Sequence, residues 1–247
     1  MSLTSKKINR ALGRLNKAIK VTFFPKDIYT YSRPDHDYHN LSYSQEGEDR
    51  ILLRIFEGQN QGFYVDVGAH HPQRFSNTYL FYLLGWQGIN IDAKPGSMSL
   101  FQKIRPNDIN LELPISDSRQ VLTYYEFNEP ALNSFCPEIS QERDGLHHYR
   151  IIKTHQLQTY TLSEVLDQYL PKEQQIDFLN VDVEGLDYQV LKSNNWSKYK
   201  PKVILAEDLN FSFLDNPPKS KVASLLFDQG YEIYAKSGFT LVFKLRA

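Results

Sequence analysis

The sequence predicts an α/β fold in which a mostly parallel sheet carries helices on both faces. From residue 43 onward, short apolar runs of strand length alternate with segments that have a helical period. The last two apolar runs, 231–234 and 240–244, flank Ser237 and Gly238 and predict a closing hairpin. Repeated strand–helix–strand units produce parallel neighbours, because each helix returns the chain to the same edge of the sheet.

The first half of this region contains three predicted strands of the sheet. Ser44, followed by acidic residues, is an N-cap signature for a helix that carries the apolar positions of 51–56. The strands are predicted at 63–67, 88–92 and 109–115, and helices at 76–84 and 96–104. Alternation of apolar and polar residues over 119–127 predicts an added strand. Residues 128–159 show little periodicity, and we expect a lid or substrate-binding insertion there.

The second half repeats the alternation of strands and helices. Strands are predicted at 176–183 and 203–206, and helices at 162–170, from 188 to 191 and at 219–227. Gly185 and Gly230 each lie at a point where the chain must turn between elements. The series therefore predicts a parallel sheet whose last part is antiparallel.

Composition excludes several classes of protein. No apolar run approaches the ~20 residues that a transmembrane helix needs. The net charge of −1 argues against a nucleic-acid-binding domain. Cys136 is the only cysteine, so neither an internal disulfide nor a cysteine-based zinc site can form. A lone cysteine suits a reducing compartment, and we expect a cytoplasmic protein.

The near-zero net charge hides a basic N-terminal arm. Residues 1–26 carry seven basic side chains and no acidic one, so residues 27–247 have a net charge of −8. Ile8, Leu12, Leu15 and Ile19 form one apolar stripe of a predicted helix over 3–20. This helix either packs on the main domain or docks on a partner or a membrane surface. We therefore divide the chain into an arm with linker, 1–42, and a catalytic domain, 43–247.

Acidic and polar side chains follow five of the predicted strands. They are Asp66 with Gly68, Ala69, His70 and His71; Asp92 with Ala93; Ser116 with Asp117; Asp182 with Glu184; and Glu207 with Asp208. A single carboxylate at a strand end commonly caps the next helix. Five in series are harder to explain that way, because the carboxyl ends of parallel strands converge on one ligand cleft.

The first strand–helix turn distinguishes two kinds of nucleotide site. A dinucleotide site needs the pattern G-x-G-x-x-G, but this turn offers only Gly68, followed by His70 and His71, which would obstruct a pyrophosphate. Asp92, 26 residues after Asp66, ends the second strand, where an acid accepts hydrogen bonds from ribose hydroxyls. Adenosine without a pyrophosphate indicates S-adenosylmethionine.

Five short segments in chain order then point to a known family. They are YSQEGED (43–49), FYVDVGAHHP (63–72), GWQGINIDA (85–93), RPNDINL (105–111) and IDFLNVDVEG (176–185). In these segments the sequence resembles the FkbM family of S-adenosylmethionine-dependent methyltransferases. The resemblance implies the Rossmann-like class I methyltransferase fold, a seven-stranded, mostly parallel sheet with an antiparallel final strand. It covers about residues 43–210, without the insertion at 128–159.

The resemblance also implies an activity and a set of site residues. Family members mostly methylate hydroxyls of sugars, polyketides and related secondary metabolites, so the expected substrate is a sugar or glycan precursor. By this resemblance Gln45, the turn of Asp66, Gly68, Ala69 and His70, Asp92 with Ala93, Ser116 with Asp117, and Asp182 bind the cofactor. Asp92 would take the ribose hydroxyls, Ser116 and Asp117 would lie near the adenine, and Asp182 would face the methionine part or the acceptor.

Methyl transfer to a hydroxyl needs a base, and four residues are candidates. They are Asp182, Glu184, His70 and His71, of which we favour Asp182 and His70. Asp182 and Glu184 are close enough in sequence for their charges to couple, and Gly185 makes a turn plausible directly after them. Asp182, Glu207 and Asp208 with a histidine could also hold a divalent metal, but their spacing does not predict one.

Two other functions remain open from the residues alone. An NAD-dependent enzyme acting on nucleotide sugars would use the same fold, but its glycine pattern is missing. A non-catalytic nucleotide-binding protein of this fold would have no need of Gln45, Asp66, Asp92 and Asp182 together. The surplus of aromatic residues and the basic cluster from Arg143 to His155 suit a sugar on an anionic carrier.

Overall fold

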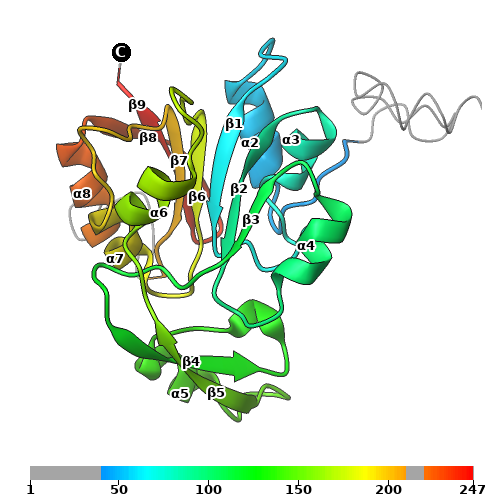
Figure 1. The fold of residues 1–247 in the computed structure, drawn as a ribbon, viewed down its shortest axis with the longest axis vertical. Helices are drawn as coiled ribbons and strands as arrows, with labels where there is room; N and C mark the ends of the chain where they lie inside the picture. The colour runs from blue at the N-terminus through cyan, green and yellow to red at the C-terminus, as the bar shows by residue number, and fades with distance from the viewer. Residues whose placement is uncertain (1–39, 210–219, 247) are drawn as a thin grey trace, which may run out of the picture.

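A computed structural model describes residues 40–209 and 220–246, which form three layers, a central sheet with helices on each of its two faces (Figure 1). The sheet has seven strands in the order β3-β2-β1-β6-β7-β9-β8. Their bounds are β1 Phe63–Val67, β2 Gln87–Asp92, β3 Ile109–Glu112, β6 Phe178–Val181, β7 Val203–Glu207, β8 Tyr231–Ser237 and β9 Thr240–Leu245. Only β9 runs antiparallel to its neighbours, β7 and β8. The predicted fold class is confirmed.

Helices bury both faces of the sheet. Helices α6 (Leu162–Tyr169), α7 (Asp187–Lys192) and α8 (Lys221–Asp228) pack on one face, while α2 (Glu48–Ile55) and α3 (Tyr79–Leu83) pack on the other. Helix α4 (Met98–Ile104) lies beside β3. Within β1, Val65 and Val67 join the first core and Tyr64 the second. Burial on both faces explains why these strands read as continuous apolar runs.

The first helix begins later than its predicted cap. Gly47 is the N-cap of α2 and has a left-handed backbone with φ 88°. The Ser44 hydroxyl still accepts a bond from the Asp49 amide at 3.3 Å, and the Asp49 carboxylate accepts one from the Tyr43 amide at 2.7 Å. Hydrogen bonds to the side chains of Ser44 and Asp49 therefore hold this turn, and Ser44 lies in the loop that precedes the helix.

Residues between β3 and α6 form a separate unit beyond the carboxyl ends of the parallel strands (Figure 1). It contains β4 (Val121–Phe127), the 3₁₀ turn η2 (Pro130–Leu132), α5 (Pro137–Arg143) and β5 (Ile151–Gln158). The added strand predicted at 119–127 exists as β4, but it pairs antiparallel with β5 and not with the main sheet. Five of the eight residues of β5 are exposed and the strand has no clear apolar period, so the sequence did not indicate a strand there.

Several predicted elements are shorter in the structure. Strand β3 ends at Glu112, and Ile115 makes only an isolated bridge to Tyr160. Strand β6 ends at Val181, so Asp182 already belongs to the turn. Of the helix predicted at 76–84, only α3 forms. Residues 76–78 make a turn ahead of it, in which the Ser76 hydroxyl accepts hydrogen bonds from the amides of Thr78 and Tyr79.

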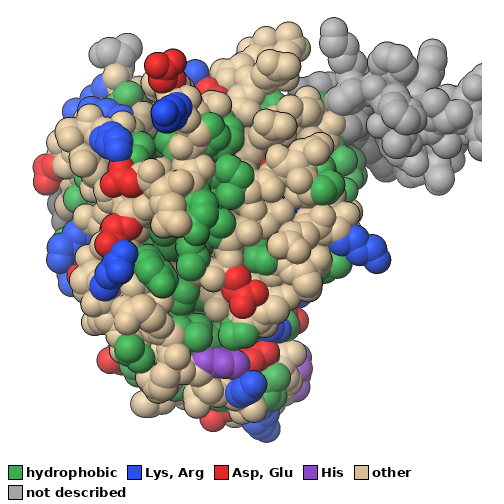
Figure 2. All heavy atoms as spheres, in the orientation of Figure 1, with side chains coloured by type: hydrophobic (Ala, Val, Ile, Leu, Met, Phe, Trp, Pro, Cys, Tyr) green, Lys and Arg blue, Asp and Glu red, His purple; other side chains and the backbone are tan. Residues whose placement is uncertain are grey.

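The basic arm at 1–26, with its helix at 3–20, lies outside the described residues. In the described ranges no helix is both long and apolar enough to cross a membrane. On the face seen in Figure 2, basic and acidic side chains are interspersed over the described residues. Over the described residues, that face therefore has no continuous basic patch of the kind that binds nucleic acid.

Candidate active site

A cleft of about 450 Å³ lies at the carboxyl ends of β1, β2, β6 and β7. Ten residues predicted for the site or for a metal line it: Gln45, Asp66, Gly68, Ala69, His70, Asp92, Ala93, Asp182, Glu184 and Glu207. The insertion supplies the opposite wall through Tyr124, residues 129–135, Arg143 and Tyr149. The cleft thus occupies the place where an open α/β sheet binds ligands.

Four predicted site residues do not line this cleft: His71, Ser116, Asp117 and Asp208. The Nδ1 atom of His71 accepts the amides of Gln73 and Arg74 at 3.1 and 3.0 Å, so this ring shapes the turn. Ser116 and Asp117 lie past the early end of β3, and the Ser116 amide donates to the Tyr160 carbonyl. They begin the insertion and are not at a strand end.

The turn after β1 presses closely against the end of β6. Gly68 has φ 85°, and a Cβ atom there would lie 1.7 Å from the carbonyl oxygen of Asp182. The amides of Gly68 and Ala69 both donate to the Ile91 carbonyl. Only glycine combines this backbone conformation with so close an approach. The turn therefore joins three strand ends in one cleft.

Asp92 is held rigidly at the end of β2. Its Oδ2 accepts the His70 amide at 2.9 Å and its Oδ1 accepts the Lys94 amide at 2.8 Å. A carboxylate has about four acceptor positions, so two remain for a ligand. Asp92 lies in the cleft lining, and its geometry fits the predicted contact with two ribose hydroxyls.

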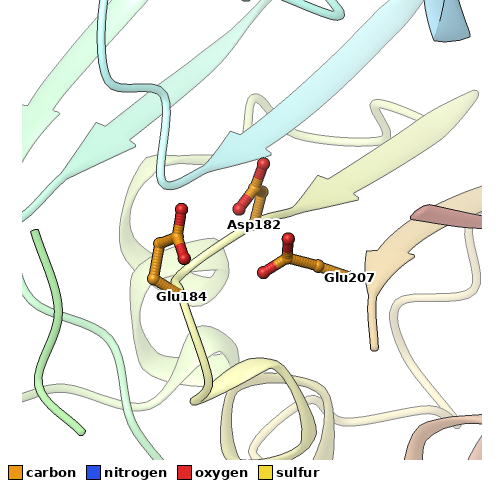
Figure 3. A group of neighbouring side chains, drawn as sticks. All are labelled: Asp182, Glu184 and Glu207. Carbon is orange, nitrogen blue, oxygen red and sulfur yellow. The ribbon is translucent and has the colours of Figure 1, made fainter. Parts of the chain in front are cut away.

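Three carboxylates meet at the other end of the cleft (Figure 3). Asp182, Glu184 and Glu207 each offer an oxygen, and these atoms lie within 4.8 Å of one another. Glu184 and Gly185 have φ of 53° and 105°, which supplies the turn that lets Glu184 point to the side of Asp182. Glu207 arrives from the neighbouring strand β7. We call Asp182, Glu184 and Glu207 the acidic cluster.

The surroundings of the acidic cluster raise the proton affinity of its carboxyl groups. Burial, with the Asp182 charge next, raises the pKa of Glu207 to about 10. Burial and the Glu184 charge raise the pKa of Asp182, and burial also raises that of Glu184. Arg143 opposes the last effect, donating to Glu184 Oε2 at 2.7 Å. At neutral pH Glu207 therefore retains its proton until a positive ligand favours its release.

The family follows from a match to most of this domain. The model of the methyltransferase FkbM domain matches residues 66–233, which contain β2, β3, β6 and β7 in full and parts of β1 and β8. The chain belongs to the FkbM methyltransferase family. The family predicted from the five sequence segments is confirmed. No curated protein matches the chain.

Solved methyltransferase structures are distantly similar to this FkbM methyltransferase. A precorrin-6y C5,15-methyltransferase from Geobacter metallireducens GS-15 has 11% identity and a TM-score of 0.41, covering 81% of this chain and 87% of that chain. An O-methyltransferase from Bacillus cereus, solved in complex with SAH, has 10% identity and a TM-score of 0.37, covering 94% and 97%. The fold assignment rests on the sheet order itself.

His70 lines the cleft as a neutral imidazole. Burial, together with the Arg74 charge, lowers the pKa of His70 to about 4. Its Nε2 lies 3.4 Å from Arg74 Nη1, which donates to Glu129 at 2.9 Å. His70 has a left-handed backbone, with φ 51°. Such strain in a non-glycine residue is typical of functional sites, but this ring is a weak base.

Beneath the cleft of this FkbM methyltransferase lies a buried polar network that sequence reasoning missed. Asp66 accepts hydrogen bonds from Thr78 at 2.7 Å and Asn180 at 2.9 Å. The fully buried Arg105 donates to Thr78 at 3.0 Å, to Tyr64 at 2.8 Å and to Asp108 at 2.8 Å. The one signal in the sequence is that Arg105 begins one of the five family segments.

Proposed function

We propose that this methyltransferase uses S-adenosylmethionine to methylate a hydroxyl of a sugar or a related glycan or secondary-metabolite acceptor. The observation that carries the proposal is one cleft with Asp92 at one end and the acidic cluster at the other. A carboxylate with free acceptor positions suits a ribose diol, and buried carboxylates suit a sulfonium cation. Membership in the FkbM family supports the same chemistry.

The residues present fit the cofactor. The volume of about 450 Å³ lies within the usual range for small-molecule sites. The small residues Gly68, Ala69 and Ala93 leave space beside Asp92. His70 follows the Gly68 turn where a dinucleotide site would need further glycines, so an adenosine without a pyrophosphate fits better than NAD.

When bound, S-adenosylmethionine supplies a methyl group already activated by its positive sulfur. The protein holds the acceptor oxygen in line with that methyl group and removes its proton. We assign the base to Asp182, whose proton affinity is increased by burial and by the charge of Glu184. His70 is the alternative within the cleft, while His71 is occupied by its own turn.

Exposed aromatic rings around the cleft support a sugar acceptor. Phe75 is 40% exposed and Phe239 54% exposed, and both line the cleft. The Arg74 guanidinium lies 4.2 Å from the centroid of the Phe75 ring. Such rings pack against the apolar faces of sugars, while the polar rim takes the hydroxyls. Of the basic cluster predicted for an anionic carrier, Arg143 lines the cleft, whereas His155 bonds Glu126.

A binding and activity experiment tests the proposal. In calorimetry we expect the full chain to bind S-adenosylmethionine and its demethylated product, and NAD at least a hundredfold more weakly. Incubation with a panel of nucleotide-linked sugars should add 14 Da to at least one of them, read by mass spectrometry. Binding of NAD in preference would reveal a dehydrogenase-type enzyme, and binding without methylation of any hydroxyl acceptor would indicate a binding protein.

The same assay examines metal dependence. Arg143 already neutralises Glu184, and among the described residues no histidine joins the acidic cluster. We therefore propose that the cluster works with protons and not with a divalent cation. Activity should survive exhaustive treatment with EDTA. Loss of activity that Mg²⁺ restores would contradict this.

Cofactor affinity should depend on pH. Because burial, with the Asp182 charge next, raises the pKa of Glu207 to about 10, this cleft residue binds a proton that a cation displaces. Between pH 6 and 8, S-adenosylmethionine should bind several-fold more tightly as pH rises, while unliganded stability falls. Adenosine, which has no cationic group, is the control ligand. An equal pH dependence for both ligands, measured by calorimetry, would refute the assignment.

A further inference from the structure

Two buried acceptor atoms in the cleft lack a hydrogen-bond partner among the described residues. They are Oδ1 of Asn77 and Oε2 of Glu207. Asn77 is only 8% exposed, so water does not replace the missing partner freely. A buried acceptor without a donor is costly, and few occur in folded proteins. The position of Oδ1 of Asn77 in the candidate cofactor cleft suggests that a ligand supplies the missing hydrogen-bond donor.

The hydrogen-bond chain around Asn77 fixes which of its atoms is left over. An ionised Asp66 only accepts, so the group of Asn180 that faces it at 2.9 Å is the Nδ2 amide. The Oδ1 of Asn180 then accepts Nδ2 of Asn77, also at 2.9 Å. This order leaves Oδ1 of Asn77 without a partner. The atom that needs a donor is therefore an oxygen.

The chemistry of the cofactor selects the donor. Asn77 shares its cleft with Asp66, Asn180 and the acidic cluster, where negative charge gathers. A cation belongs at this end, and S-adenosylmethionine has two cationic groups. The sulfonium has no N–H or O–H to donate, whereas the ammonium of its methionine part has three donors. Of these two cationic groups, only the ammonium can therefore donate a hydrogen bond to the Asn77 oxygen.

We propose that Asn77 binds the ammonium group of the cofactor's amino-acid part through its Oδ1 atom. The proposal rests on the proposed function, because it takes the cofactor to be S-adenosylmethionine. It adds a residue that no sequence pattern selects, because Asn77 precedes α3 and lies outside the five family segments. A charge-assisted hydrogen bond of this kind typically changes affinity by about tenfold or more.

Two ligands and two variants test the proposal by calorimetry at pH 7. S-adenosylhomocysteine carries the ammonium, and its des-amino analogue has hydrogen in place of the amino group. Asn77→Ala should weaken binding of S-adenosylhomocysteine about tenfold and that of the analogue less than twofold. Asn194→Ala is the matched control, because Asn194 is also 8% exposed with an unpartnered Oδ1 but lies outside the cleft. It should change neither affinity.

The outcomes separate this inference from the proposed function. Equal losses for the two ligands, or no loss for either, would overturn the role of Asn77 while leaving cofactor binding intact. Failure of the unmodified chain to bind S-adenosylhomocysteine would overturn the proposed function itself. If the alanine variant does not fold, Asn77→Ser makes a smaller change and should show the same selective loss, because its hydroxyl has a shorter reach.

Discussion

Asp182→Asn should lower methyl transfer by about 10²- to 10⁴-fold, the range that a positioned base typically contributes. The amide keeps the size of the side chain but cannot take a proton from the acceptor hydroxyl. The measurement is single-turnover methylation with saturating S-adenosylmethionine, which separates the chemical step from cofactor binding. Because the cluster attracts the cofactor through several carboxylates, we expect cofactor affinity to change much less than the rate.

Two further variants decide whether the loss belongs to Asp182. Asp228→Asn makes the same chemical change at an exposed position at the end of α8 and should leave the rate unchanged. Glu207→Gln should reduce the rate less than Asp182→Asn, because Glu207 is a neighbour of the assigned base in the acidic cluster and not the base itself. If Asp182→Asn retains full turnover, the base is another group, and His70 is the next to test.

Strand ends were the part of the site that the sequence could predict. Strands buried on both faces appear as apolar runs, so their carboxyl ends are visible in the sequence, and Asp66, Asp92, Asp182 and Glu207 indeed line one cleft. The predicted strand end was wrong where the apolar run in the sequence continues beyond the end of the strand. Leu113 and Ile115 continue the pattern of β3 although the strand ends at Glu112, so Ser116 and Asp117 follow a loop and do not line the cleft, and their place near the adenine stays a prediction.

Other features depend on contacts that no local pattern encodes. Glu184 reaches the acidic cluster because its backbone is left-handed, which is rare for a non-glycine residue and was foreseen only through Gly185. Strand β5 is held by pairing with β4, while its own side chains alternate without a clear apolar face. The proposed role of Asn77 depends on Asn180, which is 103 residues away in the sequence and is itself oriented by the Asp66 carboxylate.

Arg105→Met should lower the free energy of unfolding by about 3–5 kcal/mol, because it leaves Asp108 charged and buried without its partner. Both side chains of this ion pair have no solvent exposure, and the Nε atom of Arg105 lies 2.8 Å from Asp108. The measurement is equilibrium unfolding in urea. We also expect weaker cofactor binding, because Arg105 holds Thr78, which in turn donates to Asp66 in the cleft.

A second ion pair offers a matched control for burial. Arg119 and Glu164 also meet through Nε at 2.8 Å, but their side chains are 63% and 39% exposed. Water solvates whichever partner remains, so Arg119→Met should cost less than about 1 kcal/mol. The double variant Arg105→Met/Asp108→Asn should recover part of the loss by removing the buried charge. If Arg105→Met and Arg119→Met lowered the free energy of unfolding equally, burial would not be what makes the Arg105 network important. Arg105 would then stabilise the fold through packing alone.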